Sequence, residues 1–166
     1  MAGGKKARLK GSTFERQIAK DISSWTGMHF TRTPMSGGWS KTGDVTPKKP
    51  EHMVKFPFNI ECKNQNVFCT NIIIKMVESG SMPKILKKWW KQCSDDAKKS
   101  KRIPILIMSN SRQPIWVMLT AKHFKAMGLM KYSSIVVRFE GFRLLLWSDF
   151  LNTEFKSILK GCKNAR

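Results

Sequence analysis

The sequence has 166 residues, of which 41% are hydrophobic, so one domain with a hydrophobic core is expected and a disordered chain is excluded. It carries 31 Lys and Arg against 11 Asp and Glu, and the net charge of +20 favours a polyanionic partner, with nucleic acid as the first candidate. No apolar run reaches transmembrane length, and the basic N-terminus is not followed by an apolar segment. We therefore expect a cytoplasmic protein associated with nucleic acid and not with a membrane.

The chain begins with a basic segment, residues 1–11, that contains almost nothing to bury. We expect this segment to be a flexible basic arm and residues 12–166 to form a single domain. Positive side chains on such an arm would contact the phosphate backbone of nucleic acid. These side chains are Lys5, Lys6, Arg8 and Lys10.

The first helix is predicted from about Thr13 to Trp25, because apolar residues recur there at a spacing of three and four. Ser12 and Glu15 at its start have the spacing of a capping box, in which the Glu15 carboxylate would accept from the Ser12 backbone amide. The competing role for Glu15 is a third acid near a metal ion. Spacing alone leaves both roles open and slightly favours the cap.

A short strand is predicted over Met28–Thr33, followed by a loop rich in Gly, Ser and Thr from Pro34 to Gly43. The loop has Arg32 and Lys41 nearby, so its backbone could approach a phosphate closely. The spacing of a P-loop is absent. The loop leads directly to Asp44, at the start of another short extended piece.

The stretch Phe58–Lys63 alternates apolar and polar residues with the period of a strand that has one buried face. Glu61 and Lys63 therefore project from the same face. If the extended piece at Asp44 pairs with this strand in a hairpin, two carboxylates and an ammonium group meet at one point. Two such carboxylates repel each other unless a cation lies between them, and hard oxygen ligands suit Mg²⁺ or its substitute Mn²⁺. The alternative is a weak acid–lysine pair on a solvated face.

The second half of the chain alternates helix and strand signals. The order of the elements indicates an α/β fold in which helices flank a mixed β-sheet. The predicted elements are an extended stretch after a turn within Asn64–Ile74, a helix over Pro83–Lys99, strands over Ile103–Met108 and Ile115–Leu119, a short helix from the cap Thr120 to Met127, a hairpin of Ser134–Phe139 with Arg143–Trp147, and a last helix from the cap Ser148 to Gly161.

Together these motifs resemble the PD-(D/E)XK nuclease superfamily and, more narrowly, the archaeal-type Holliday junction resolvases and their phage relatives. The resemblance covers roughly residues 11–110. The resolvases' Pro-Asp is Gly43-Asp44 here, and a longer insertion, Thr46 to Pro57, precedes the Glu-x-Lys strand. The motifs that carry the resemblance are Gly11-Ser12-Thr13-Phe14-Glu15-Arg16, Arg32-Thr33-Pro34-Met35-Ser36-Gly37-Gly38, Asp44, and Ile60-Glu61-Cys62-Lys63.

The resemblance implies a restriction-endonuclease-like fold, a metal-dependent endonuclease that cleaves branched DNA as a homodimer, and a phage gene. It implies catalytic roles for Glu15, Asp44, Glu61 and Lys63, and it favours the metal or water role of Glu15 over the cap. The metal ligands would be Asp44, Glu61, the Cys62 carbonyl and Glu15, with Gln92 as support. Besides the four cations of the arm, the residues that would contact DNA are Arg16, Arg32, Ser36, Gly37, Gly38 and Lys41.

Two alternatives remain open from the sequence. A non-catalytic basic nucleic-acid-binding protein explains the net charge equally well, but not why the few acids include Glu15, Asp44 and Glu61 at nuclease-like positions. A nuclease of the same fold could instead act on flaps, ends or duplex DNA.

Overall fold

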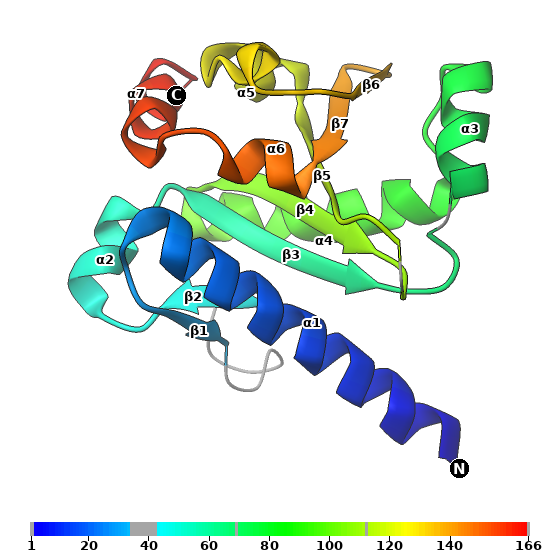
Figure 1. Ribbon diagram of the computed structural model, residues 1–166, viewed down its shortest axis with the longest axis horizontal. Coiled ribbons are helices and arrows are strands. Elements are labelled where there is room, and N and C mark those ends of the chain that lie inside the picture. The colour runs from blue at the N-terminus through cyan, green and yellow to red at the C-terminus, as the bar shows by residue number, and fades with distance from the viewer. Residues whose placement is uncertain (1, 34–42, 69, 112, 166) are drawn as a thin grey trace.

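The computed structural model describes residues 2–33, 43–68, 70–111 and 113–165, and within them a five-stranded mixed sheet forms the centre of the molecule (Figure 1). Its spatial order is β3-β4-β5-β7-β6, with β3 and β4 parallel and the other neighbours antiparallel. This confirms the predicted α/β class. The strands are β3 (Phe58–Asn64), β4 (Ile103–Ser109), β5 (Trp116–Thr120), β6 (Val136–Phe139) and β7 (Phe142–Leu146).

Helices cover both faces of this sheet, and a separate two-stranded antiparallel ribbon is formed by β1 (Phe30–Arg32) and β2 (Val45–Pro47). No helix in the described ranges is long and apolar enough to span a membrane. The helices are α1 (Ala2–Thr26), α2 (Pro50–Lys55), α3 (Thr70–Ser79), α4 (Lys84–Ser100), α5 (Ala121–Ala126), α6 (Trp147–Leu151) and α7 (Phe155–Ala165), with a 3₁₀ turn at Leu129–Lys131.

The alternation of side chains along β4 divides the interior into two hydrophobic clusters. Ile105 and Ile107 belong to the cluster that contains the apolar stripe of α1, whereas Leu106 and Met108 belong to the cluster with the buried face of α4. A continuous apolar run is typical of a strand buried on both faces. β3 pairs with β4 in parallel and continues the same sheet. Like β4, it is covered by a helix on each face, by α1 on one and by α4 on the other.

The first helix begins much earlier than predicted. Residues 2–11, expected as an arm outside the helix, continue α1 without interruption, and Ser12 lies inside the helix. Its hydroxyl donates to the Leu9 carbonyl oxygen over 3.1 Å, which is the back-bonding of a serine within a helix. The predicted capping box of Ser12 and Glu15 is therefore wrong. The division into an arm and a domain stays a prediction.

Two further predictions are corrected. The stretch within Asn64–Ile74 was expected to end in an extended segment, but Thr70 begins α3, because Ile72, Ile73 and Met76 pack on the α4-side cluster at helical spacing. The last helix was expected to be continuous and to end at Gly161. It is divided into α6 and α7, and α7 continues to Ala165.

Gly161 serves helix packing and not helix termination. A Cβ at this position would lie 2.4 Å from the Ala126 carbonyl oxygen, so only glycine permits this approach of α7 to α5. The predicted cap of the short helix is confirmed, since the Thr120 side chain accepts from the His123 backbone amide. The hairpin of β6 and β7 is confirmed as well.

Candidate active site

Glu61 and Lys63 project from β3 toward α4. Lys63 Nζ donates to Glu61 Oε1 over 2.5 Å and to Gln92 Oε1 of α4 over 3.1 Å. Glu61 is only 2% exposed, because α4 covers this face of the strand. The strand therefore has two buried faces, whereas one buried face was predicted. The interpretation of Glu61 and Lys63 as a solvated surface pair is wrong.

Asp44 reaches this strand by a route other than the predicted hairpin. β2 pairs with β1, and Gly43 forms an isolated parallel bridge with Ile60. The Asp44 backbone amide donates to the Ile60 carbonyl over 2.8 Å, and the Cys62 backbone amide donates to Asp44 Oδ2 over 2.8 Å. Asp44 is thus fixed beside the backbone of the Glu-x-Lys segment.

Gly43 is required for this approach. Its φ is +79°, and a Cβ there would lie 2.3 Å from the Ile60 carbonyl oxygen. A larger residue would both strain the backbone and separate Asp44 from β3. The glycine that replaces the proline of the resolvase pattern is therefore the residue that places the aspartate here.

Glu15 brings a third carboxylate from α1. It is half-buried and forms an ion pair with Arg32 Nε. Its negative charge raises the pKa values of both Asp44 and Glu61, so the three carboxylates belong to one electrostatic site. The contact with Arg32 also assigns that arginine a place beside the site.

Burial and neighbouring carboxylates destabilise the charged forms of both central carboxylates. Burial, followed by the charge of Glu61, raises the pKa of Asp44 from 3.8 to about 7, although the hydrogen bond from the Cys62 amide opposes the shift. Burial also raises the pKa of Glu61, against the opposing charge of Lys63. A divalent cation between the carboxylates would relieve both effects.

The donors at this site fit Mg²⁺ better than Zn²⁺. The part of the chain that the structure describes contains no group of three or more His, Cys, Asp and Glu side chains suited to hold a metal ion. Mg²⁺ is commonly held by one or two carboxylates, with water and substrate phosphate completing its shell, and Asp44 and Glu61 supply such a pair. The Cys62 sulfur packs in the α1-side core, where burial raises the pKa of its thiol and keeps it protonated. The carbonyl of Cys62 as a ligand stays a prediction.

The other predicted residues are expected to contact DNA, and the structure does not bring those of them that it describes into contact with the three carboxylates. Arg8 and Arg16 are exposed on α1. Lys10 is closer to the site, because its ammonium group donates to Asn66 Oδ1 over 2.6 Å, beyond the end of β3. The predicted residues that fall outside the described part of the structure are the side chains of Lys5 and Lys6, and Ser36, Gly37, Gly38 and Lys41.

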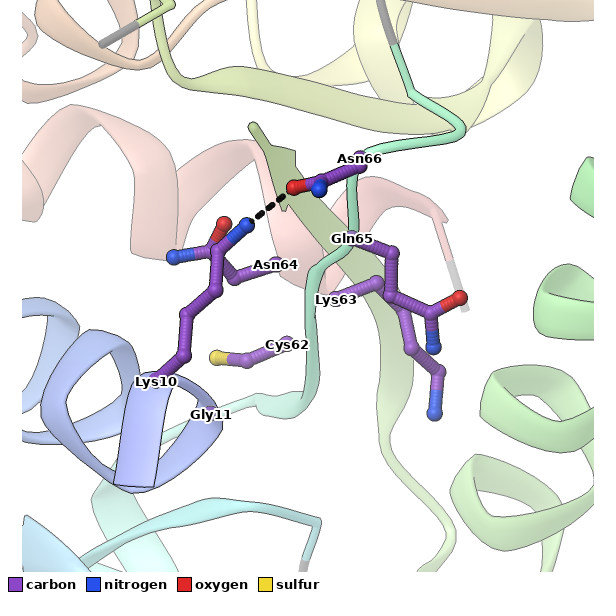
Figure 2. A pocket seen from close by; sticks show the side chains of 7 residues that line it. All are labelled: Lys10, Gly11, Cys62, Lys63, Asn64, Gln65 and Asn66. Atoms are coloured by element: carbon purple, nitrogen blue, oxygen red, sulfur yellow. Dashed lines mark hydrogen bonds between the residues drawn. The ribbon is translucent and has the colours of Figure 1, made fainter. Parts of the chain in front are cut away.

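A cavity that sequence reasoning missed adjoins Lys63. Its volume is about 550 Å³, and Figure 2 shows its lining at the end of β3. The signal that could have drawn notice is the run of amide residues directly after the Glu-x-Lys motif. The lining consists of Lys10, Gly11, Cys62, Lys63, Asn64, Gln65 and Asn66.

Comparisons with known proteins give a family match, one relative and one solved structure. Residues 6–158 match the family described as "Phage putative PDDEXK endonuclease". Protein D14 of Escherichia phage T5 is 28% identical over 111 residues, which are 64% of this chain and 66%, just under two thirds, of that protein. Among solved structures, Hjc, a Holliday junction resolvase from the archaeal hyperthermophile Archaeoglobus fulgidus, has a TM-score of 0.41 and 13% identity, over 90% of this chain and 95% of that chain.

Proposed function

Because this chain belongs to the phage PDDEXK endonuclease family, we propose that it is a metal-dependent endonuclease that cleaves phosphodiester bonds in branched DNA. Its class is that of the PD-(D/E)XK endonucleases, on a mixed sheet flanked by helices. The proposal adds Mg²⁺ as the ion, branched DNA as the substrate, and a homodimer as the acting form.

The observation that carries this proposal is the meeting of Asp44, Glu61 and Lys63 at the edge of the sheet. Two buried carboxylates with raised pKa values lie beside a lysine held by Glu61 and Gln92. A purely DNA-binding protein has no use for buried negative charge next to its ligand's phosphates. A site that binds a metal cation requires such buried negative charge.

Each residue has a definite task in such a site. Asp44 and Glu61 would hold Mg²⁺, which when bound supplies an activated water and neutralises charge on the reacting phosphate. Lys63 would orient the attacking water or stabilise the developing negative charge, with Gln92 fixing the position of its ammonium group. Glu15 would position metal or water from α1.

DNA as substrate is supported by the family and by the net charge of +20, since exposed lysines and arginines bind the phosphate backbone. Branched DNA is supported by the resemblance of the motifs to the junction resolvases. A homodimer would supply two sites for paired cuts in a four-way junction. The phage family and the phage T5 relative support a phage gene.

The experiment is cleavage of a synthetic mobile four-way junction beside duplex and flap substrates, with Mg²⁺, with Mn²⁺ and with EDTA. We expect junction cleavage with either metal and none with EDTA. Asp44→Asn and Glu61→Gln should each lower the rate by more than about 100-fold, because even the outer-shell partners of metal ligands are worth 10–100-fold. Glu154→Gln, on the exposed start of α7, is the control and should cleave like the wild type.

Three results would change the proposal. Wild-type rates in both carboxylate variants would remove the proposed mechanism. Equal cleavage of flaps or duplex would replace branched DNA as the substrate. Tight binding of junctions without cleavage under any metal condition would favour the non-catalytic alternative.

A further inference from the structure

The cavity at the end of β3 is lined by residues that neighbour the candidate catalytic carboxylates. The Cys62 backbone amide in its lining donates to Asp44 Oδ2, and a Cβ at Gly11, also in the lining, would lie 3.9 Å from Glu15 Oε1. If a scissile phosphate lies at Asp44 and Glu61, this cavity is adjacent to it and has room for a neighbouring nucleotide.

The polar groups in the lining are mainly amides. The side chains of Asn64, Gln65 and Asn66 each offer donors and an acceptor, and among the described lining residues the ionised groups are Lys10 and Lys63. A site for phosphate alone needs positive charge. Amides suit the edge of a base, because Asn pairs with adenine N6 and N7 through two hydrogen bonds.

The turn that presents these amides is held by backbone contacts. The Gln65 amide donates to the Ser109 carbonyl over 3.1 Å, and the Phe68 amide donates to the Gln65 carbonyl over 3.0 Å. Asn110 Nδ2 donates to the Asn66 carbonyl over 3.3 Å. Side chains on a fixed turn lose less freedom when they bind a ligand.

Figure 2 shows which of the amides lie on the cavity's α1 side. Asn64 points to the same side of the strand as Cys62, whereas Gln65 points away with Lys63. Lys10 reaches from α1 to Asn66 Oδ1, over 2.6 Å. Asn64 Oδ1 is buried and has no hydrogen-bond partner among the described residues.

These contacts suit an exchange of partners. A phosphate forms a stronger, charge-assisted hydrogen bond with an ammonium group than a neutral amide does. An arriving nucleotide would therefore draw Lys10 to its phosphate. That movement would release the Asn66 oxygen for contact with the base.

We propose that this cavity binds the nucleotide next to the scissile phosphate, with Lys10 on its phosphate and the amides of Asn64 and Asn66 on the edge of its base, adenine being preferred. The inference rests on the proposed nuclease function. It adds a base preference at one position to a protein whose other proposed contacts are with phosphates, which carry no sequence information.

The first test does not depend on cleavage. ¹⁵N-labelled wild-type protein in EDTA is titrated with deoxyadenosine monophosphate, deoxycytidine monophosphate and inorganic phosphate, and the side-chain amide signals of Asn64 and Asn66 are followed by NMR. We expect both signals to shift at the lowest concentration with the adenine nucleotide. Phosphate alone, which can only draw Lys10 away from Asn66, should shift the Asn66 signal and leave the Asn64 signal in place. No shift with either nucleotide, or equal shifts with all three ligands, would overturn the proposal.

Single variants locate the binding. Asn66→Ala should weaken adenine nucleotide binding about tenfold, within the range that a bidentate base contact contributes. Asn152→Ala, an exposed residue after α6, is the matched control and should bind like the wild type. Asn66 is exposed, so thermal unfolding of Asn66→Ala should match that of the wild type.

A second test uses cleavage. Substrates that differ only in the base on either side of the cut are compared, and we expect adenine to be cleaved about tenfold faster than the least favoured base at one position. Asn66→Ala should bring this ratio close to one. Equal cleavage of all bases by the wild type would refute the cavity proposal alone. Nucleotide binding without any DNA cleavage would contradict only the proposed nuclease function.

Discussion

Glu15 is a single residue whose role one isosteric substitution can decide. The structure removes the helix-cap role and leaves an ion pair with Arg32 beside the Asp44 site. We expect Glu15→Gln to lower the cleavage rate by at least about tenfold. The pair is partly exposed, so the free energy of unfolding should change by less than about 1 kcal/mol. Rates are measured with Mg²⁺, and stability is measured by urea unfolding.

Ser12→Ala is the matched control for Glu15→Gln, because Ser12 lies one turn earlier on α1 and its hydroxyl bonds, within the described part of the chain, to the Leu9 carbonyl and to Arg16. It should be silent in both measurements. A Glu15→Gln protein with wild-type cleavage would remove Glu15 from the site.

The raised pKa of Asp44 also predicts that the stability of the protein depends on pH. Its pKa is about 7 in the folded protein and 3.8 ordinarily, so between these values the folded state holds a proton that the unfolded state has lost. Stability contributed by this proton is complete below about pH 4 and is lost as the pH rises to about 7. Without metal, Asp44→Asn should therefore gain stability relative to the wild type on going from about pH 5 to about pH 8.

Thermal unfolding in EDTA at both pH values measures this difference. Titrating groups that do not interact with Asp44 are common to the two proteins and cancel in the comparison. Asp95→Asn removes an exposed carboxylate whose pKa is lowered by Lys91, and it should follow the wild type across this range. Mg²⁺ should stabilise the wild type more at the higher pH, because it displaces the Asp44 proton. If the stability of the wild type and of Asp44→Asn changed equally with pH, burial would not raise the pKa of Asp44.

At the scale of the element, α1 has a part that packs in the core and a preceding part that we expect to contact DNA. Its buried stripe starts at Phe14, whereas the turns before Lys10 extend beyond the sheet (Figure 1). Deleting residues 1–7 should therefore shift the melting temperature by less than about 2 °C, less than a 1 kcal/mol change typically causes in a domain of this size. It should weaken binding to DNA, because Lys5 and Lys6 are removed.

Binding of the deletion variant is measured at several salt concentrations on the Asp44→Asn background, which prevents cleavage. The slope of log affinity against log salt should become shallower by about 0.9 for each lost phosphate contact. Loss of the unfolding transition would show that the first turns of α1 are structural.

For the whole molecule, the net charge of +20 predicts binding dominated by phosphate neutralisation. If the protein makes six to ten phosphate contacts, its affinity for DNA should fall by roughly 10³ to 10⁵ between about 50 and 200 mM salt. Fluorescence anisotropy with a labelled junction, in EDTA, measures this fall. A nearly flat dependence would mean that the charge serves another purpose.

The sequence by itself determined the features that depend on short-range patterns. The strand that carries Glu61 and Lys63 follows from alternation, and α4 follows from its apolar stripe. The hairpin of β6 and β7 follows from two β-rich runs around a glycine turn. The class of chemistry follows from the resemblance of these motifs to the PD-(D/E)XK nucleases, and the family match confirms it.

Only the tertiary structure decided how these features meet. The helical state of α3 depends on packing against a cluster formed by segments distant in the sequence. The burial of Glu61 depends on α4, which covers the face of the sheet opposite to α1. Asp44 reaches β3 through the bridge of Gly43 with Ile60, and Lys63 is held by Gln92. Spacing along a chain specifies which side chains share a face, whereas contacts between distant segments are decided by how the hydrophobic faces of all elements are buried together.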